Sequence, residues 1–236
     1  MTNIAIKEKI GNFVNYFLES FLFFIIITVV AQIFDYNTES PNITEKIIFI
    51  ILGVIVKLSV VFGLIFYLKK NIGNSKPHNT SVFLNIITVL VTLLAMVIIL
   101  YGLIFMQPNV QETGSNAKLL QSTFKTIIHD KLALLYYIVS LCIFSPIIEE
   151  IVCRGILLKK GYFVGQIGSM ILSSIIFSMI HSPNSIYIFL NYFLTGLGLM
   201  IIRVKTDNVK YSILGHVIWN SCIMIYILCS TFGSKM

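Results

Sequence analysis

Long runs of apolar residues, separated by short polar connectors, make up most of the chain. A helix that crosses a bilayer needs about 20 consecutive, mostly apolar residues, and several of these runs approach that length. The pattern therefore predicts an all-α fold, a polytopic membrane helix bundle with about seven transmembrane helices. The predicted spans are Phe13–Ile33, Ile47–Tyr67, Val82–Phe105, Leu132 to about Leu158, Val164–His181, Ser185–Ile202 and Ser212–Cys229.

The composition supports this assignment. Of the 236 residues, 57% are hydrophobic and 11% are charged. Soluble domains carry about 25% charged residues. A chain with this composition cannot cover a water-facing surface, so its solvent has to be lipid, and the lipid bilayer is an expected partner.

The net charge of +7 does not indicate a nucleic-acid partner. The lysines and arginines gather in alternate connectors, which is the pattern of the positive-inside rule and not of phosphate binding along one surface. We therefore expect a multi-pass protein of the cell membrane with a cytoplasmic N-terminus and, with seven spans, an external C-terminus.

The longest polar connector, residues 107–131, suggests a division of the chain. Residues 1–131 would hold accessory transmembrane helices and an extracytoplasmic loop. Residues 132–236 would form the core bundle, and Gly196, Gly198 and Gly215 would let its helices approach closely.

Two adjacent carboxylates, Glu149 and Glu150, lie within the fourth predicted span. An ionisable group in a span costs about 2.5–3.5 kcal/mol on insertion scales, so it requires an explanation. Glu150 and Arg154 are four positions apart on one helix face, in the favourable order for an ion pair. Glu149 would point elsewhere and stay free to act as a general base. The alternative is a structural ion-pair cluster that braces two helices.

Two later spans carry further polar side chains at helical spacing. Phe177 and His181 share one face of the fifth span, and His216 and Asn220 share one face of the seventh. A hydrolase needs a base for water and donors for the developing oxyanion, and these spans would supply them. The alternative is that His216 and Asn220 only join helices by hydrogen bonds.

Together these segments resemble a known family of membrane enzymes. Glu-Glu-x-x-x-Arg at Glu149–Arg154, Phe-x-x-x-His at Phe177–His181 and His-x-x-x-Asn at His216–Asn220 look like the three motifs of the CPBP intramembrane proteases. This family is also called Abi and contains the type II CAAX prenyl proteases. The resemblance covers about Leu132–Cys229, under half of the chain.

The resemblance implies a role for each motif residue. Glu149 would activate water with His181, and His216 and Asn220 would stabilise the oxyanion. Glu150 would hold the site together with two supporting residues, Arg154 and Phe177.

The function implied is an intramembrane endopeptidase acting on a membrane-associated peptide or protein, not necessarily a prenylated one. The Ile-, Asn- and Lys-rich composition fits an AT-rich bacterial genome, which favours peptide processing, self-immunity or signalling. Alternatives are a non-catalytic bacteriocin-immunity or peptide-binding protein on the same fold, and a small transporter that relays protons.

A zinc site is an alternative to metal-free hydrolysis. Two histidines and a glutamate can bind Zn²⁺, but the chain has no HExxH motif and Asn220 is a poor zinc ligand. We expect no metal and no other cofactor. Loss of activity to chelators, with recovery on adding Zn²⁺, would favour zinc.

The depth of His181 poses a geometric problem. A simple crossing would put it near the outer surface, whereas Glu149 lies nearer the inner one. They can meet if Gly161–Ser169 is largely interfacial and the chain breaks within the membrane region after His181. We expect such a buried break, together with a water-filled cavity that reaches Glu149.

One further pair of charges falls within predicted spans. Lys57 lies near the middle of the second span and Glu19 lies within the first. An ion pair between them is a hypothesis, and the alternative is a snorkelling lysine with an interfacial glutamate.

Overall fold

The computed structural model describes residues 3–36, 40, 42–72, 81–105 and 115–233, and every regular element in these ranges is a helix. The predicted all-α bundle is therefore confirmed. The elements are α1 (Asn3–Tyr36), α2 (Ile43–Asn71), α3 (Val82–Phe105), α4 (Ser115–Ile127), α5 (Lys131–Val139), η2 (Ser140–Phe144), α6 (Ser145–Glu150), η3 (Ile151–Leu157), α7 (Leu158–Lys160), η4 (Gly161–Val164), α8 (Gly165–Met179), α9 (Ile186–Thr206) and α10 (Val209–Gly233).

Within the described ranges, 5 helical segments are long and apolar enough to cross a membrane, and α1 contributes a shorter apolar stretch, Ile10–Ile26. One of the five, Lys131–Met179, contains both the fourth and the fifth predicted spans. Each predicted span thus coincides with helical structure, although the fifth is shorter than a full crossing.

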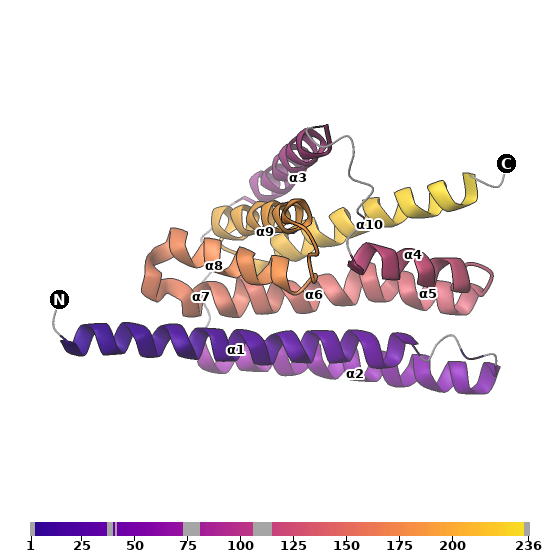
Figure 1. Ribbon diagram of the computed structural model, residues 1–236, viewed down its shortest axis with the longest axis horizontal. Coiled ribbons are helices and arrows are strands. Elements are labelled where there is room, and N and C mark those ends of the chain that lie inside the picture. Colours follow the sequence, from indigo (N-terminus) through magenta and orange to yellow (C-terminus); the bar gives the residue numbers. More distant parts are fainter. Residues whose placement is uncertain (1–2, 37–39, 41, 73–80, 106–114, 234–236) are drawn as a thin grey trace.

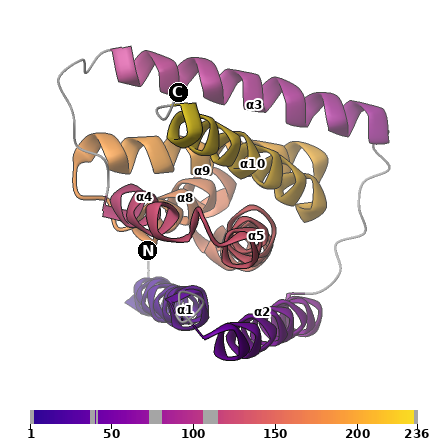
Figure 2. The same ribbon diagram turned by 90° about the vertical axis from the view of Figure 1, so that its right-hand side faces the viewer.

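The helices are arranged in layers. Figure 2 shows α1 and α2 side by side along one side of the bundle and α3 along the opposite side. The α5–α7 segment, α8, α9 and α10 lie between them. The helices α3 and α9 are foreshortened in Figure 1 and extend across Figure 2, so both cross the direction of α1 and α2.

The fourth predicted span is one continuous segment, residues 131–160, with two π-helical stretches in it. In η2 the N–H of Ser145 donates to the carbonyl of Ser140, and in η3 that of Leu158 donates to Cys153. Each of these bonds spans five residues, which is the wider π turn, and such turns often occur at functional sites. The two carboxylates of interest lie between them, at the end of α6.

Serines on α8 bind the backbone of the second π-helical stretch. The Ser173 hydroxyl donates to the Cys153 carbonyl at 2.7 Å, and the Ser169 hydroxyl donates to the Leu158 carbonyl. Both serines are fully buried. The α8 helix is therefore fixed against η3 by hydrogen bonds as well as by apolar packing.

The turn before α8 agrees with the predicted start of the fifth span at Val164. A tight 3-10 turn occupies Gly161–Val164, and α8 begins at Gly165. The interfacial position of Gly161–Ser169 stays a prediction. Gly161 lies so close to Ser169 that a Cβ atom there would be 3.1 Å from the serine Cβ. The absence of a side chain at Gly161 permits this approach.

The polar connector before the core also differs from the prediction, because it contains the amphipathic helix α4. Phe124 and Ile127 are buried, and they pack with Ala133 of α5 and Met224 of α10. A few apolar residues at helical spacing in a polar segment were enough to form a short helix against the bundle.

The proposed division at residue 131 stays a prediction, but helices from both sides of it share one core. Leu93 and Met96 of α3 belong to the same buried cluster as Leu199 of α9. A side chain at Gly198 of α9 would collide with Met96, and one at Gly196 would lie 3.2 Å from Phe177. These glycines therefore allow the close approach predicted for them.

Candidate active site

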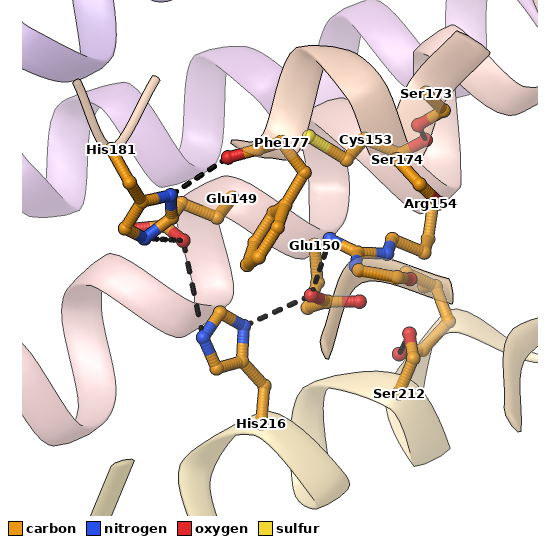
Figure 3. Close-up of polar contacts among 12 residues, drawn as sticks. Glu149, Glu150, Cys153, Arg154, Ser173, Ser174, Phe177, His181, Ser212 and His216 are labelled. Atoms are coloured by element: carbon orange, nitrogen blue, oxygen red, sulfur yellow. Dashed lines mark hydrogen bonds and ion pairs between the residues drawn. The ribbon is translucent and has the colours of Figure 1, made fainter. Parts of the chain in front are cut away.

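Two adjacent glutamates end α6, and their surroundings differ. Glu150 has no exposed surface, whereas 8% of Glu149 is exposed. Consecutive residues on a helix point about 100° apart, so the two carboxylates face different neighbours. Figure 3 shows Glu150 directed toward Arg154 and Glu149 directed toward His181 and His216.

Glu150 forms the predicted ion pair with Arg154. One Arg154 nitrogen, Nη1, lies 2.8 Å from Glu150 Oε1, and both side chains are fully buried. Arg154 Nη2 donates to the Gly196 carbonyl of α9 at 2.8 Å, and the guanidinium lies 4.4 Å from the centre of the Phe177 ring. A buried charge pair is tolerated only with such additional partners, because both ions have lost their water.

The imidazole of His216 connects the two glutamates. Its Nδ1 lies 2.9 Å from Glu150 Oε1, and its Nε2 lies 3.9 Å from Glu149 Oε2. A carboxylate paired with arginine only accepts hydrogen bonds, so Nδ1 carries the proton. In the neutral ring, Nε2 then presents its lone pair toward Glu149.

His181 reaches Glu149 from the other side. The distance from its Nε2 to Glu149 Oε2 is 3.9 Å, and its Nδ1 lies 2.7 Å from the Phe177 carbonyl. A carbonyl oxygen can only accept, so Nδ1 is again the donor and Nε2 of the neutral ring faces the carboxylate. The predicted meeting of His181 with Glu149 is present in the structure.

A short α8 explains how His181 lies at the depth of Glu149. The helix has 15 residues, or about 22 Å at 1.5 Å per residue, which is less than the roughly 30 Å of a hydrocarbon core. The chain breaks after it, and Ser182 takes a left-handed conformation with φ 49°. The break was predicted to be buried, but Ser182 and Asn184 are exposed on the protein surface.

Phe177 contacts most members of this cluster. Its ring centre lies 4.8 Å from that of His181 and 5.6 Å from that of His216, besides its contact with Arg154. The ring is only 1% exposed. Sequence reasoning placed Phe177 in a supporting role, and in the structure it packs against both imidazoles.

Asn220 has a different partner from the other motif residues. Its Nδ2 donates to the Leu141 carbonyl in η2 at 3.0 Å. One cluster in the structure therefore contains Glu149, Glu150, Arg154, Phe177, His181 and His216. The Asn220 side chain instead binds the backbone of the π-helical stretch η2.

The hypothesis of a Glu19–Lys57 ion pair is wrong. Lys57 is 2% exposed, and its ammonium group donates to the Tyr136 hydroxyl at 3.1 Å and to the Ser140 hydroxyl. Glu19 instead pairs with Lys160 at the end of α7. Both charged side chains thus join different helices, but each binds other partners than the predicted one.

The described part of the chain contains no group of three or more histidine, cysteine, aspartate or glutamate side chains arranged to hold a metal ion. Zinc dependence therefore stays an alternative for a chelation experiment to decide. The histidine, glutamate and arginine side chains of the cluster form ion pairs and hydrogen bonds with one another and with backbone carbonyls.

Fold and site together define a class: a polytopic helical membrane protein with a buried glutamate, histidine and arginine cluster. Residues 131–222 match the model of the type II CAAX prenyl endopeptidase Rce1-like family. The family resemblance predicted from the three motifs is thereby confirmed for this segment, which is less than half of the 236 residues. No curated protein and no solved structure matches the chain.

Proposed function

We propose that the protein is an intramembrane endopeptidase in which Glu149 activates the attacking water. The observation that carries the proposal is the position of Glu149 Oε2, with His181 Nε2 and His216 Nε2 both at 3.9 Å from it. These separations are too long for direct hydrogen bonds, but a water molecule can donate one proton to Glu149 and the other to His181. The family match over residues 131–222 supports a proteolytic reaction.

The proposed reaction transfers one proton twice. Glu149 accepts a proton as the water oxygen bonds to the carbonyl carbon of the scissile peptide. Glu149 then returns this proton to the amide nitrogen, the carbon–nitrogen bond breaks, and a carboxylic acid and an amine leave. His216, when protonated, donates from Nε2 to the oxyanion while Glu150 holds its Nδ1.

Glu150 and Arg154 keep this arrangement in place. Their opposite charges offset each other where both side chains are fully buried, and the Glu150 carboxylate fixes which nitrogen of His216 faces Glu149. The resemblance implied that Asn220 stabilises the oxyanion. In this proposal its amide instead donates a hydrogen bond to the backbone of η2.

The substrate in this proposal is a peptide or protein that lies in or near the bilayer. We also propose that the protein lies in the cell membrane with its N-terminus in the cytoplasm, because the basic residues cluster in alternate connectors, as the positive-inside rule requires. A bacterial role in peptide processing, self-immunity or signalling fits the composition of the chain.

The test compares the peptides of cells that carry the natural chain with those of cells that carry Glu149→Gln. A matched control is Glu45→Gln, because Glu45 is an exposed glutamate at the start of α2. We expect specific peptides to disappear with Glu149→Gln and to persist with the control. Identical peptide profiles and an unchanged phenotype would reject the protease and leave the peptide-binding alternative.

A further inference from the structure

The histidine beside Glu149 lies outside regular helix. His181 lies two residues after Met179, the last residue of α8. Its N–H donates to the Ser178 carbonyl at 3.1 Å, and the next residue is left-handed. A side chain at a helix end has weaker backbone restraints than one in the helix interior, because the ends of helices fray. The direction of the imidazole therefore depends on its side-chain contacts.

Two of these contacts come from α8 itself. The Phe177 carbonyl binds Nδ1 at 2.7 Å, and the Phe177 ring packs at 4.8 Å between ring centres with planes inclined by 49°. Both would move together with the end of α8. They set the tautomer of His181 but do not tie the ring to another helix.

Tyr192 provides a contact from α9. Its ring stacks on the His181 imidazole with centres 4.1 Å apart and planes inclined by 21°. Aromatic pairs in proteins usually have centroids 4.5–7 Å apart, so this is a close stack. Stacking covers a face of the imidazole and leaves its edge, with Nε2, directed at Glu149.

The same face of α9 also contacts the buried arginine. Tyr192 and Gly196 are one helical turn apart, and the Gly196 carbonyl accepts from Arg154 Nη2 at 2.8 Å. The Ser178 hydroxyl donates to the Phe189 carbonyl at 2.8 Å, which joins the end of α8 to the start of α9. One turn of α9 therefore contacts both Arg154 of the Glu150–Arg154 pair and His181.

We propose that Tyr192 is a positioning residue that holds the His181 ring with Nε2 toward Glu149. The effect of this positioning on catalysis rests on the proposed function, because an imidazole that turns away can no longer share a water with Glu149. No motif of the sequence singled out Tyr192, since an aromatic residue in an apolar span looks like any other packing residue.

The test measures how fast each histidine reacts with diethyl pyrocarbonate, which acylates neutral imidazole nitrogen, in the purified full chain in lipid nanodiscs. Mass spectrometry separates His181, which is 16% exposed, from His216, which is 3% exposed, and from the exposed His129. The variants are Tyr192→Leu, which removes the ring, and Tyr192→Phe, which retains it. The control is Phe193→Leu on the same helix, because that ring stacks on Phe189.

We expect Tyr192→Leu to raise the His181 rate by roughly 2- to 10-fold, the factor that corresponds to about 0.5–1.5 kcal/mol for an aromatic pair. The His216 rate should stay unchanged, and Tyr192→Phe and Phe193→Leu should behave like the natural chain. An unchanged His181 rate in Tyr192→Leu would overturn the proposal. So would a joint rise of His181 and His216, which would show general loosening, or a rise in Tyr192→Phe.

This readout needs no substrate, so it separates the two proposals. If His181 is released in Tyr192→Leu while Glu149→Gln changes no cellular peptide, the positioning role holds and the proteolytic function fails. If Glu149→Gln removes peptides while the His181 rate never changes, the protease stands and the role of Tyr192 fails.

Discussion

At the scale of single residues, the site is a set of charges arranged so that one carboxylate stays available. Glu150 has Arg154 and His216 as partners, whereas Glu149 Oε2 is buried and has no hydrogen-bond partner among the described residues. The difference follows from their adjacency, because consecutive helical residues face different neighbours. Availability of Glu149 is what the proposed reaction requires.

The Glu150–Arg154 pair predicts a large loss of stability when one member is removed. Arg154→Met leaves a fully buried carboxylate without its counter-charge, which costs about 3–5 kcal/mol in buried pairs. The double variant Glu150→Gln with Arg154→Met should recover part of that loss. Thermal unfolding in detergent measures both, and fully additive losses would contradict the pairing.

At the scale of elements, the π-helical turns and the short α8 set the geometry. Side chains from other helices bind the π segments: Asn220 binds η2, and Ser173 binds η3. Because η3 carries Arg154, a change in its backbone would move the charge pair as well.

Two neighbouring serines on α8 allow a matched test of this idea. Ser173→Ala removes a hydrogen bond to the Cys153 carbonyl, and we expect a loss of about 0.5–1.5 kcal/mol. Ser174, equally buried, bonds to the Met170 carbonyl of its own helix, so Ser174→Ala should cost less. Equal losses in the free energy of unfolding would contradict a special role for the contact with η3.

The junction before the core predicts a pH effect on stability. Asp130 caps α5, and its hydrogen bond with Lys46 lowers the pKa of that carboxyl below its usual value. A lowered folded-state pKa gives stability above the ordinary aspartate pKa of about 4, and this stability is lost as the pH falls through the lowered value.

Asp130→Asn should therefore lower the melting temperature at pH 7, while the difference from the natural chain shrinks in acid. Asparagine keeps the cap, so the variant tests the charge alone. Melting curves at several pH values provide the measurement, and a difference that does not depend on pH would argue against the ion pair.

At the scale of the whole molecule, the apolar pattern was sufficient to predict the helical bundle, because lipid leaves few alternatives to helices. Spacing within one helix also predicted the Glu150–Arg154 pair. The partners of Asn220, Lys57 and Glu19 depend on how distant helices cross, and no local pattern encodes that. Likewise, α4 was missed because its apolar residues are few.

The proposed orientation of the molecule, with a cytoplasmic N-terminus, rests on the distribution of its basic residues. Figure 1 shows the start of α1 and the end of α10 at opposite ends of the long axis, which fits a cytoplasmic N-terminus and an external C-terminus. A reporter that is active only in the cytoplasm should work when fused to the N-terminus and fail at the C-terminus. The reverse result would overturn this orientation.

The central claim is that Glu149 activates water, and a cleavage rate tests it most directly. The purified chain in lipid nanodiscs would be given the membrane precursor of a peptide that disappears from cells carrying Glu149→Gln. Removal of a general base lowers turnover by about 10²- to 10⁴-fold. We therefore expect the cleavage rate of Glu149→Gln to fall by at least about 10²-fold, whereas Glu45→Gln should cleave at the natural rate. A Glu149→Gln rate equal to that of the natural chain would contradict the account.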